Sequence, residues 1–283
     1  MKYAGVVVLY NPIEEDVKDN ISSYIDNLDC IYLVDNSEID NHMMFENNQK
    51  IIYLPNKKNL GIAKALNTGA IHAIQDGFDW LLTMDQDSKF ELNALSIMKN
   101  YIENNEIVES LGIVSPFHKT LVTSEIVKTG IEKPIIVMTS GNLINLKVYQ
   151  KIKGFKDWMF IDCVDFDYCL NLIRNGFEII QLNNAILNHE LGDLVKRKVF
   201  GKTIFSDNHN YIRRYYIVRN RHYIYDEYHN DFPEYCAAEI RCTKAEVRNV
   251  IFFEKDKLRK LWYMYKGYRD YKKGIKGEMN KWW

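Results

Sequence analysis

Long apolar runs, paired cysteines and glycine-rich phosphate loops are all missing from this 283-residue chain. No stretch approaches the roughly 20 apolar residues that a membrane-spanning helix needs, so we expect no such helix. The five cysteines are an odd number and contain no C-x-x-C pair, which argues against a disulfide framework or a zinc site and favours a reducing cytosol. A strand-like segment follows Met1-Lys2-Tyr3 directly, so we expect no signal peptide and a cytoplasmic protein.

Neither sign of charge dominates the chain. The 37 Lys and Arg residues nearly balance the 38 Asp and Glu residues, which leaves a formal net charge of -1. This balance gives no global electrostatic reason to bind nucleic acid. The apolar fraction of 47% is normal for a folded protein and argues against disorder.

The turn after the first strand-like segment, Leu9-Tyr10-Asn11-Pro12, has no G-x-G-x-x-G fingerprint, and no G-x-x-x-x-G-K-[ST] loop occurs in the chain. A diphosphate bound here would lack the usual glycine cradle. It would therefore need a metal ion to neutralise its charge.

Strands and helices are predicted to alternate through the first part of the chain. Apolar and β-branched runs predict strands over 4–10, 30–34, 51–54, 81–84 and 111–114. Helical spacing predicts helices over 13–28, 59–74 and 92–102. Such alternation is typical of βαβ units in a mainly parallel, Rossmann-like sheet flanked by helices. Ligands of these sheets bind outside the carboxyl ends of the strands.

Three polar residues, Asn11, Asp35 and Asp85, stand at predicted carboxyl ends and should meet at one crevice. Asp85 opens the sequence Asp85-Gln86-Asp87, and carboxylate oxygens are the ligands that Mg²⁺ prefers. Aspartates are also ordinary turn and cap residues after a strand. Asp35 could likewise accept a hydrogen bond from a base or a ribose, or form an Asx-turn. Gly61 could allow close approach of a ligand, or be a plain loop residue.

Four segments resemble family 2 glycosyltransferases, in the order in which that family carries them: Val6–Pro12, Val34–Ser37, Asn59–Gly69 and Asp85–Asp87. The pattern, including Tyr215–Asn220, is most similar to bacterial rhamnosyltransferases of cell-surface polysaccharide assembly. The resemblance implies a GT-A fold, inverting transfer, a nucleotide-sugar donor and Mg²⁺ or Mn²⁺. It implies donor contacts from Tyr10, Asn11, Asp35, Asn59, Gly61, Lys64, Asp85, Gln86, Asp87 and Arg219.

A second acidic segment lies further along the chain. The spacing of Phe166, Leu170 and Ile173 predicts a helix that begins near Asp162 and ends at Gly176, with Asp162 and Asp165 in its first turn. Acidic residues are favoured there for capping alone.

A sugar hydroxyl that attacks an anomeric carbon needs a base to take its proton, and a carboxylate can serve. The resemblance places this base at Asp165. Val164 stands where many members of the family have Glu, so Asp162 and Asp167 remain alternative bases.

His189 and Arg219 each have two readings. His189 follows a predicted strand, and the resemblance places it near the metal and the diphosphate, while lone histidines are more often structural. Arg219 could bind a phosphate, or form an ion pair on a helix face.

Basic and aromatic residues alternate in the tail from Phe252 onward, and they include Trp262, Tyr265, Trp282 and Trp283. This composition suits an anionic membrane surface, and it equally suits packing against the domain or another subunit. We expect peripheral association with the inner face of the cell membrane as one outcome and a homodimer through the tail as the other.

The expected protein is a metal-dependent inverting glycosyltransferase that moves a sugar, with L-rhamnose from dTDP-rhamnose favoured and a UDP-sugar as a further option, onto a growing or lipid-linked cell-surface glycan. Residues 1–115 would bind the nucleotide sugar, residues 116–200 would bind the acceptor, and residues 201–283 would form a helical region. The alternatives are a sugar-phosphate nucleotidyltransferase, which would be expected to carry a glycine-rich basic loop after the first strand, and a non-catalytic module that binds nucleotide sugars or glycans.

Overall fold

The computed structural model describes residues 1–46, 48–105, 108–120, 123, 128–189, 194–199 and 202–279, with the backbone alone over 194–199 and 202–207. The chain forms two compact units. The first unit contains Met1–Asp157 and Val164–Glu190, and the second contains Trp158–Cys163 and Leu191–Trp283.

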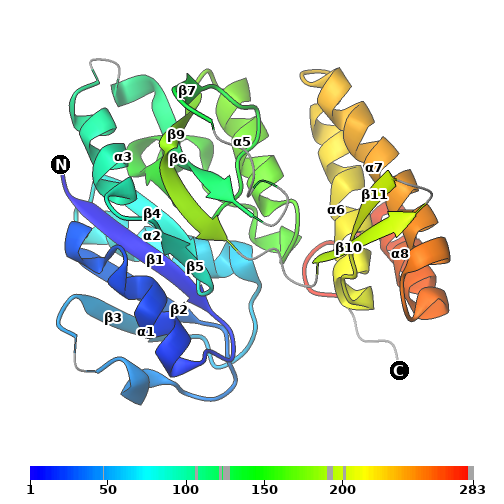
Figure 1. The fold of residues 1–283 in the computed structure, drawn as a ribbon, viewed down its shortest axis with the longest axis horizontal. Coiled ribbons are helices and arrows are strands. Elements are labelled where there is room, and N and C mark those ends of the chain that lie inside the picture. The colour runs from blue at the N-terminus through cyan, green and yellow to red at the C-terminus, as the bar shows by residue number, and fades with distance from the viewer. Residues whose placement is uncertain are drawn as a thin grey trace. The chain divides into compact units, whose positions relative to one another are not determined.

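A nine-stranded sheet is the centre of the first unit (Figure 1). Its strands are β1 (Tyr3–Leu9), β2 (Cys30–Asp35), β3 (Ile51–Pro55), β4 (Trp80–Asp85), β5 (Ser88–Phe90), β6 (Leu111–Lys119), β7 (Ile131–Glu132), β8 (Asn142–Asn145) and β9 (Glu178–His189). They are ordered β3-β2-β1-β4-β8-β6-β9-β5, with β7 beside β9. Strands β1 to β4 are parallel, β8 runs antiparallel to both of its neighbours, and β6 is parallel to β9.

Helices cover both faces of this sheet, as the βαβ pattern predicts. They are α1 (Glu14–Ser22), α2 (Ile62–Gln75), α3 (Ala94–Glu103), α4 (Leu146–Ile152) and α5 (Val164–Arg174). The buried side chains of α1 and α3 join a core cluster that contains Val7 of β1. Helix α2 lies on the opposite face, where its Gly69 meets Val6 so closely that a Cβ at Gly69 would lie 2.3 Å from Val6 Cγ2.

Several elements differ from the sequence-based expectation. The predicted helix over 13–28 ends at Ser22 and is followed by a 3₁₀ turn at Ile25–Asn27. The short strands β5 and β7 were not predicted, and β6 continues to Lys119, five residues past the predicted end. The helix expected to begin near Asp162 begins at Val164, because Asp162 and Cys163 have left-handed backbone angles of φ 63 and 62.

Among its described residues, the second unit contains a hairpin and three α-helices, besides residues 158–163 (Figure 1). The hairpin strands are β10 (Leu194–Val199) and β11 (Lys202–Asp207), and the helices are α6 (Tyr211–Tyr228), α7 (Pro233–Phe253) and α8 (Lys257–Lys272). The helical C-terminal region of the predicted fold is therefore present. The assignment of residues 1–115 and 116–200 to donor and acceptor stays a prediction.

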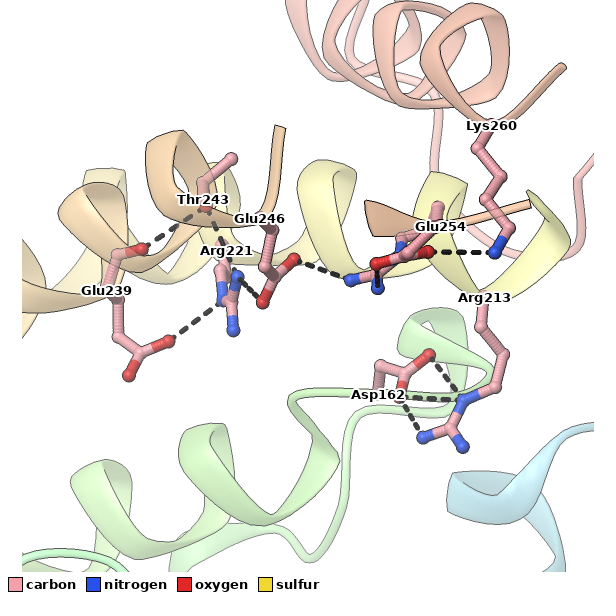
Figure 2. Close-up of polar contacts among 9 residues, drawn as sticks. Asp162, Arg213, Arg221, Glu239, Thr243, Glu246, Glu254 and Lys260 are labelled. Atoms are coloured by element: carbon pink, nitrogen blue, oxygen red, sulfur yellow. Dashed lines mark hydrogen bonds and ion pairs between the residues drawn. The ribbon is translucent and has the colours of Figure 1, made fainter. Parts of the chain in front are cut away.

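Buried charges join the three helices of the second unit (Figure 2). Arg214 is fully buried and pairs with Glu254 at 2.6 Å and with Glu246 at 3.1 Å. Glu254 in turn pairs with Lys260 at 2.8 Å. Removing one partner of such a network leaves an uncompensated buried charge, so these contacts fix the packing of α6, α7 and α8.

Candidate active site

The Asp-x-Asp motif and His189 lie together at one edge of the sheet. Strand β4 ends at Asp85, and after a short turn the chain returns as β5, whose Ser88 lies opposite His189 in the antiparallel pairing with β9. One ligand atom each of Asp85, Asp87 and His189 lies within 4.8 Å of those of the other two. The pairing of a three-residue strand therefore brings together side chains that are about a hundred positions apart in the sequence.

The donor atoms of this group suit a divalent cation. Two carboxylates and one imidazole supply oxygen and nitrogen ligands, which leaves the other coordination positions for water and phosphate oxygens. Asp85 and His189 are half-buried and Asp87 is exposed, so the group is held from one side and open on the other. Asp85, Asp87 and His189 would hold the ion, and the residues present fit Mg²⁺ or Mn²⁺.

Hydrogen bonds tie the turns after β1, β2 and β4 to one another. Gln86 exchanges two bonds with the backbone of Tyr10, with Tyr10 N–H donating at 2.8 Å and the amide donating back at 3.3 Å. The N–H of Asn11 donates to Ser37 Oγ at 2.7 Å. The three polar strand ends thus meet as predicted from the sequence. A cavity of about 370 Å³ lies here, lined by residues that include Asn11, Asp16, Asp19, Asn20, Gln86 and Asp87.

Asp35 is buried beneath this edge. Its Oδ1 accepts the Ser37 N–H at 2.8 Å, which is the Asx-turn considered from the sequence. Its Oδ2 accepts from Asn41 Nδ2 at 2.8 Å and from Tyr53 OH at 2.7 Å. Burial and the bond to Asp35 raise the pKa of Tyr53. The carboxylate therefore shapes the loop after β2, and its contact with a nucleotide base stays a prediction.

The Asn59–Gly69 segment forms the start of α2. Gly61 has a positive φ of 83, which accounts for glycine at this position, and its N–H donates to Asn59 Oδ1 at 2.9 Å. The Gly61 carbonyl accepts from Asn36 at 3.2 Å, so α2 begins against the loop after β2. Lys64 pairs with Asp157 at 2.8 Å and stays partly exposed.

The three candidate bases have different surroundings. Asp165 lies in the first turn of α5, half-buried, and its Oδ1 accepts the N–H of Phe166 at 3.0 Å. It borders a small cavity together with Thr83 of β4 and Asn142 of β8. Asp165 therefore belongs to the same unit as the Asp-x-Asp motif and lies beside the strand that carries it.

Asp167 and Asp162 are both held by cations. Asp167 is 1% exposed and pairs with Lys156 at 2.7 Å. Asp162 pairs with Arg213 at 2.6 Å within the second unit (Figure 2). The expectation that Asp162 lies in the first turn of the helix is wrong, because Asn220 draws the carbonyls of Ile161 and Asp162 toward α6 with bonds of 2.9 Å each.

Arg219 has a structural place in the second unit, which corrects the predicted phosphate contact. Its guanidinium is fully buried, donates to the carbonyls of Gly277 at 2.6 Å and Trp158 at 3.2 Å, and lies over the ring of Tyr216. A side chain enclosed by these groups has no face left for a ligand. Arg219 and its neighbour Asn220 tie residues 158–162 to α6.

Comparison with solved structures defines the fold class. The chain is similar to S. aureus TarS 1-349 in complex with UDP-GlcNAc, with a TM-score of 0.58 and 13% identity over 96% of this chain and 80% of that one. It is also similar to the mannosyltransferase PcManGT from Pyrobaculum calidifontis in complex with GDP-Man and Mn²⁺, with a TM-score of 0.56 and 12% identity over 95% and 73% of the two chains. The fold is that of the GT-A glycosyltransferases.

The family follows from the sequence match. Residues 6–151, just over half of the chain, match the model of glycosyl transferase family 2, so the chain belongs to that family. It is 26% identical over 239 residues to the dTDP-rhamnosyl transferase RfbF of Shigella flexneri, covering 76% of this chain and 77% of that protein. The resemblance seen in the motifs is thereby confirmed.

Three residues of the site were not singled out from the sequence: Ser88, Ser140 and His118. Ser88 Oγ lies 2.7 Å from His189 Nδ1, and the ring of His118 meets that of His189 at 6.3 Å between centroids. His118 comes from β6 and Ser140 from the turn before β8. No local motif marks them, because each reaches the site through strand pairing.

Proposed function

We propose that this glycosyltransferase is a metal-dependent, inverting enzyme that moves L-rhamnose from dTDP-rhamnose onto a cell-surface glycan. The choice of dTDP-rhamnose as donor is supported by the name of the Shigella flexneri relative. That relative is only 26% identical to this chain, so the identity of the sugar is itself proposed. The single observation that carries the chemistry is the group formed by Asp85, Asp87 and His189 at the carboxyl edge of the sheet. Such a group can hold a cation against a diphosphate that has no glycine cradle.

Asp165 is the proposed base. It would take the proton of the acceptor hydroxyl as that oxygen attacks the anomeric carbon from the face opposite the diphosphate. Asp162 and Asp167 are the alternative bases, and each carboxylate pairs with a cation, Asp162 with Arg213 and Asp167 with Lys156. The bound metal supplies charge stabilisation to the leaving diphosphate. Asp85 and Asp87 therefore act on the donor side and Asp165 on the acceptor side.

A screen of the purified protein against dTDP-, UDP- and GDP-sugars with Mn²⁺ or Mg²⁺ tests this function, with donor hydrolysis and transfer as readouts.

Asp165→Asn should lower turnover by about 10² to 10⁴ because general-base catalysis is lost. Donor affinity measured by calorimetry should change little. Asp26→Asn, the same substitution at an exposed site in the 3₁₀ turn after α1, is the matched control. Full turnover of Asp165→Asn would exclude Asp165 as the base, and pyrophosphate release from a nucleoside triphosphate would instead favour the nucleotidyltransferase.

We also propose that α8 lies on an anionic membrane surface, where a lipid-linked acceptor would be presented. Leu258, Trp262, Tyr265 and Tyr268 are 86%, 57%, 55% and 40% exposed, and their spacing places them along one side of the helix. Arg269 and Lys272 continue that side, and Asp270, the one acidic residue of α8, is buried. Apolar and aromatic groups flanked by cations favour the headgroup region of anionic lipids. Within the described residues, no helix has the length and apolar character that crossing a membrane requires.

A further inference from the structure

A chain of hydroxyl groups connects the two sides of the candidate metal site. The N–H of Asp85 donates to Ser140 Oγ at 3.1 Å, Ser140 Oγ donates to Ser88 Oγ at 2.8 Å, and Ser88 Oγ lies 2.7 Å from His189 Nδ1. Ser88 is 0% exposed and Ser140 is 1% exposed, so water cannot readily replace these partners. The chain therefore fixes His189 relative to the strand end that carries the aspartates.

The donors and acceptors on the Ser140 side of this chain can be assigned. Ser140 Oγ accepts from Asp85 and uses its own proton toward Ser88, so Ser88 Oγ has one lone pair and its own proton left for the imidazole of His189. His118 holds the backbone of Ser140, because its Nε2–H must donate to the Ser140 carbonyl at 2.6 Å. Ser140 is thus held through both its side chain and its backbone, and it in turn holds Ser88 beside His189.

The contact at Nδ1 determines which nitrogen of His189 can bind a cation. Ser88 occupies Nδ1, which leaves Nε2 for the metal. An imidazole that binds a metal through one nitrogen commonly donates the N–H of the other to a fixed acceptor, which sets the orientation of its ring. When Nε2 binds a metal, Nδ1 carries the proton, and Ser88 Oγ has a lone pair at 2.7 Å to accept it.

We propose that Ser88 and Ser140 are positioning residues that orient His189 for metal binding through Nε2. The proposal rests on the metal site of the proposed function. It goes further by assigning the tautomer of His189 and two residues that touch neither donor nor metal. A merely structural role for these serines would affect stability and leave metal affinity unchanged.

Binding of Mn²⁺ alone, measured from the electron paramagnetic resonance signal of the free ion, tests the proposal without turnover. Ser88→Ala and Ser140→Ala should each weaken Mn²⁺ binding by about 10- to 100-fold, as found for partners of metal-binding histidines. Ser115→Ala is the matched control, since Ser115 is a buried serine of β6 whose Oγ donates to the Pro116 carbonyl at 3.2 Å. It should bind Mn²⁺ as the wild type does. Thermal unfolding of the metal-free proteins shows whether each variant folds, and if one serine variant does not fold, the other decides.

His189→Ala and Asp87→Ala separate this inference from the metal site itself. If both lose affinity while Ser88→Ala and Ser140→Ala keep it, the hydroxyl chain has no positioning role and the metal site stands. If neither His189→Ala nor Asp87→Ala changes Mn²⁺ affinity, the proposed metal site is wrong, and the proposed role of the two serines is wrong as well. The double variant Ser88→Ala/His189→Ala should bind no more weakly than His189→Ala, because the serine acts only through the imidazole. Additive losses would overturn the proposal.

Discussion

His118 is a neutral histidine in the interior of the first unit. Its side chain is nearly enclosed, and burial lowers its pKa from 6.5 to about 4. The carbonyl of Ser140 accepts its Nε2–H, so the ring is held as the tautomer that is protonated at Nε2. A proton added to Nδ1 would create a charge with little water around it, which is unfavourable. The folded protein should therefore be less stable in acid.

The stability of the metal-free protein should therefore fall as the pH drops from about 6.5 to about 4. In this range the unfolded chain takes up a proton at His118 and the folded chain does not, so the free energy of unfolding decreases. A pKa lowered from 6.5 to about 4 corresponds to a loss on the order of 3 kcal/mol. His118→Gln keeps an N–H donor and cannot titrate. Its free energy of unfolding should therefore fall less than that of the wild type over this pH range, by the same amount. Urea unfolding at several pH values in a chelator measures the difference, and parallel curves for the two proteins would contradict it.

The acidic residues show where residue-level prediction stops. Asp165 could be placed in a helix start from local spacing alone. Asp162 and Asp167 could not be separated from it, because their partners Arg213 and Lys156 come from other parts of the chain. In the same way, nothing in the sequence around Arg219 indicates the carbonyls that its guanidinium meets, so the sequence alone leaves a phosphate contact open.

Among the elements, those with long apolar runs could be predicted and those with few residues could not. Strands β1, β2 and β4 are buried over most of their length, and each is marked in the sequence by a run of apolar residues. The strand predicted over 111–114 stops short of Pro116, which cannot donate to a ladder. The structure continues the strand past it with a register shift between Pro116 and Phe117. Strand β5 has three residues, too few for a period, although it carries the pairing that builds the metal site.

Helices α6 and α8 lie so close at Gly267 that any side chain there should destabilise the protein. A Cβ there would lie 2.4 Å from the carbonyl oxygen of Tyr215, which is backbone and cannot rotate away. Glycine to alanine in an exposed helix usually stabilises a protein by about 0.4 to 1 kcal/mol. Gly267→Ala should instead lower the free energy of unfolding by about 1 to 3 kcal/mol, as overpacking does. Urea denaturation measures this, with Tyr265→Ala on the same helix as an exposed control. A stabilised Gly267→Ala variant would mean that the two helices can separate without cost.

At the scale of the whole molecule, a helical region over 201–283 could be predicted from the sequence, but not that residues 158–163 belong to the same unit. Residues 158–163 interrupt the first unit and belong to the second, because Arg219 and Asn220 hold their carbonyls. The Tyr215–Asn220 segment, which resembles the rhamnosyltransferase pattern, thus ties distant segments together. Trp282 and Trp283, two of the tail aromatics, lie outside the described residues.

The exposed side of α8 gives a prediction for the whole protein. The protein should sediment with vesicles that contain anionic lipids at moderate salt, and more weakly with purely zwitterionic ones, since each Lys or Arg near an anionic surface contributes about 1 kcal/mol. Trp262→Ala/Tyr265→Ala removes two exposed aromatic groups and should weaken binding at least about tenfold. Tyr225→Ala, at a 39% exposed tyrosine of α6, is the matched control and should bind as the wild type does. Failure of the protein to sediment with the anionic vesicles would exclude membrane binding. A dimer in sedimentation velocity that the double variant loses would show that a second copy of the chain covers α8 instead.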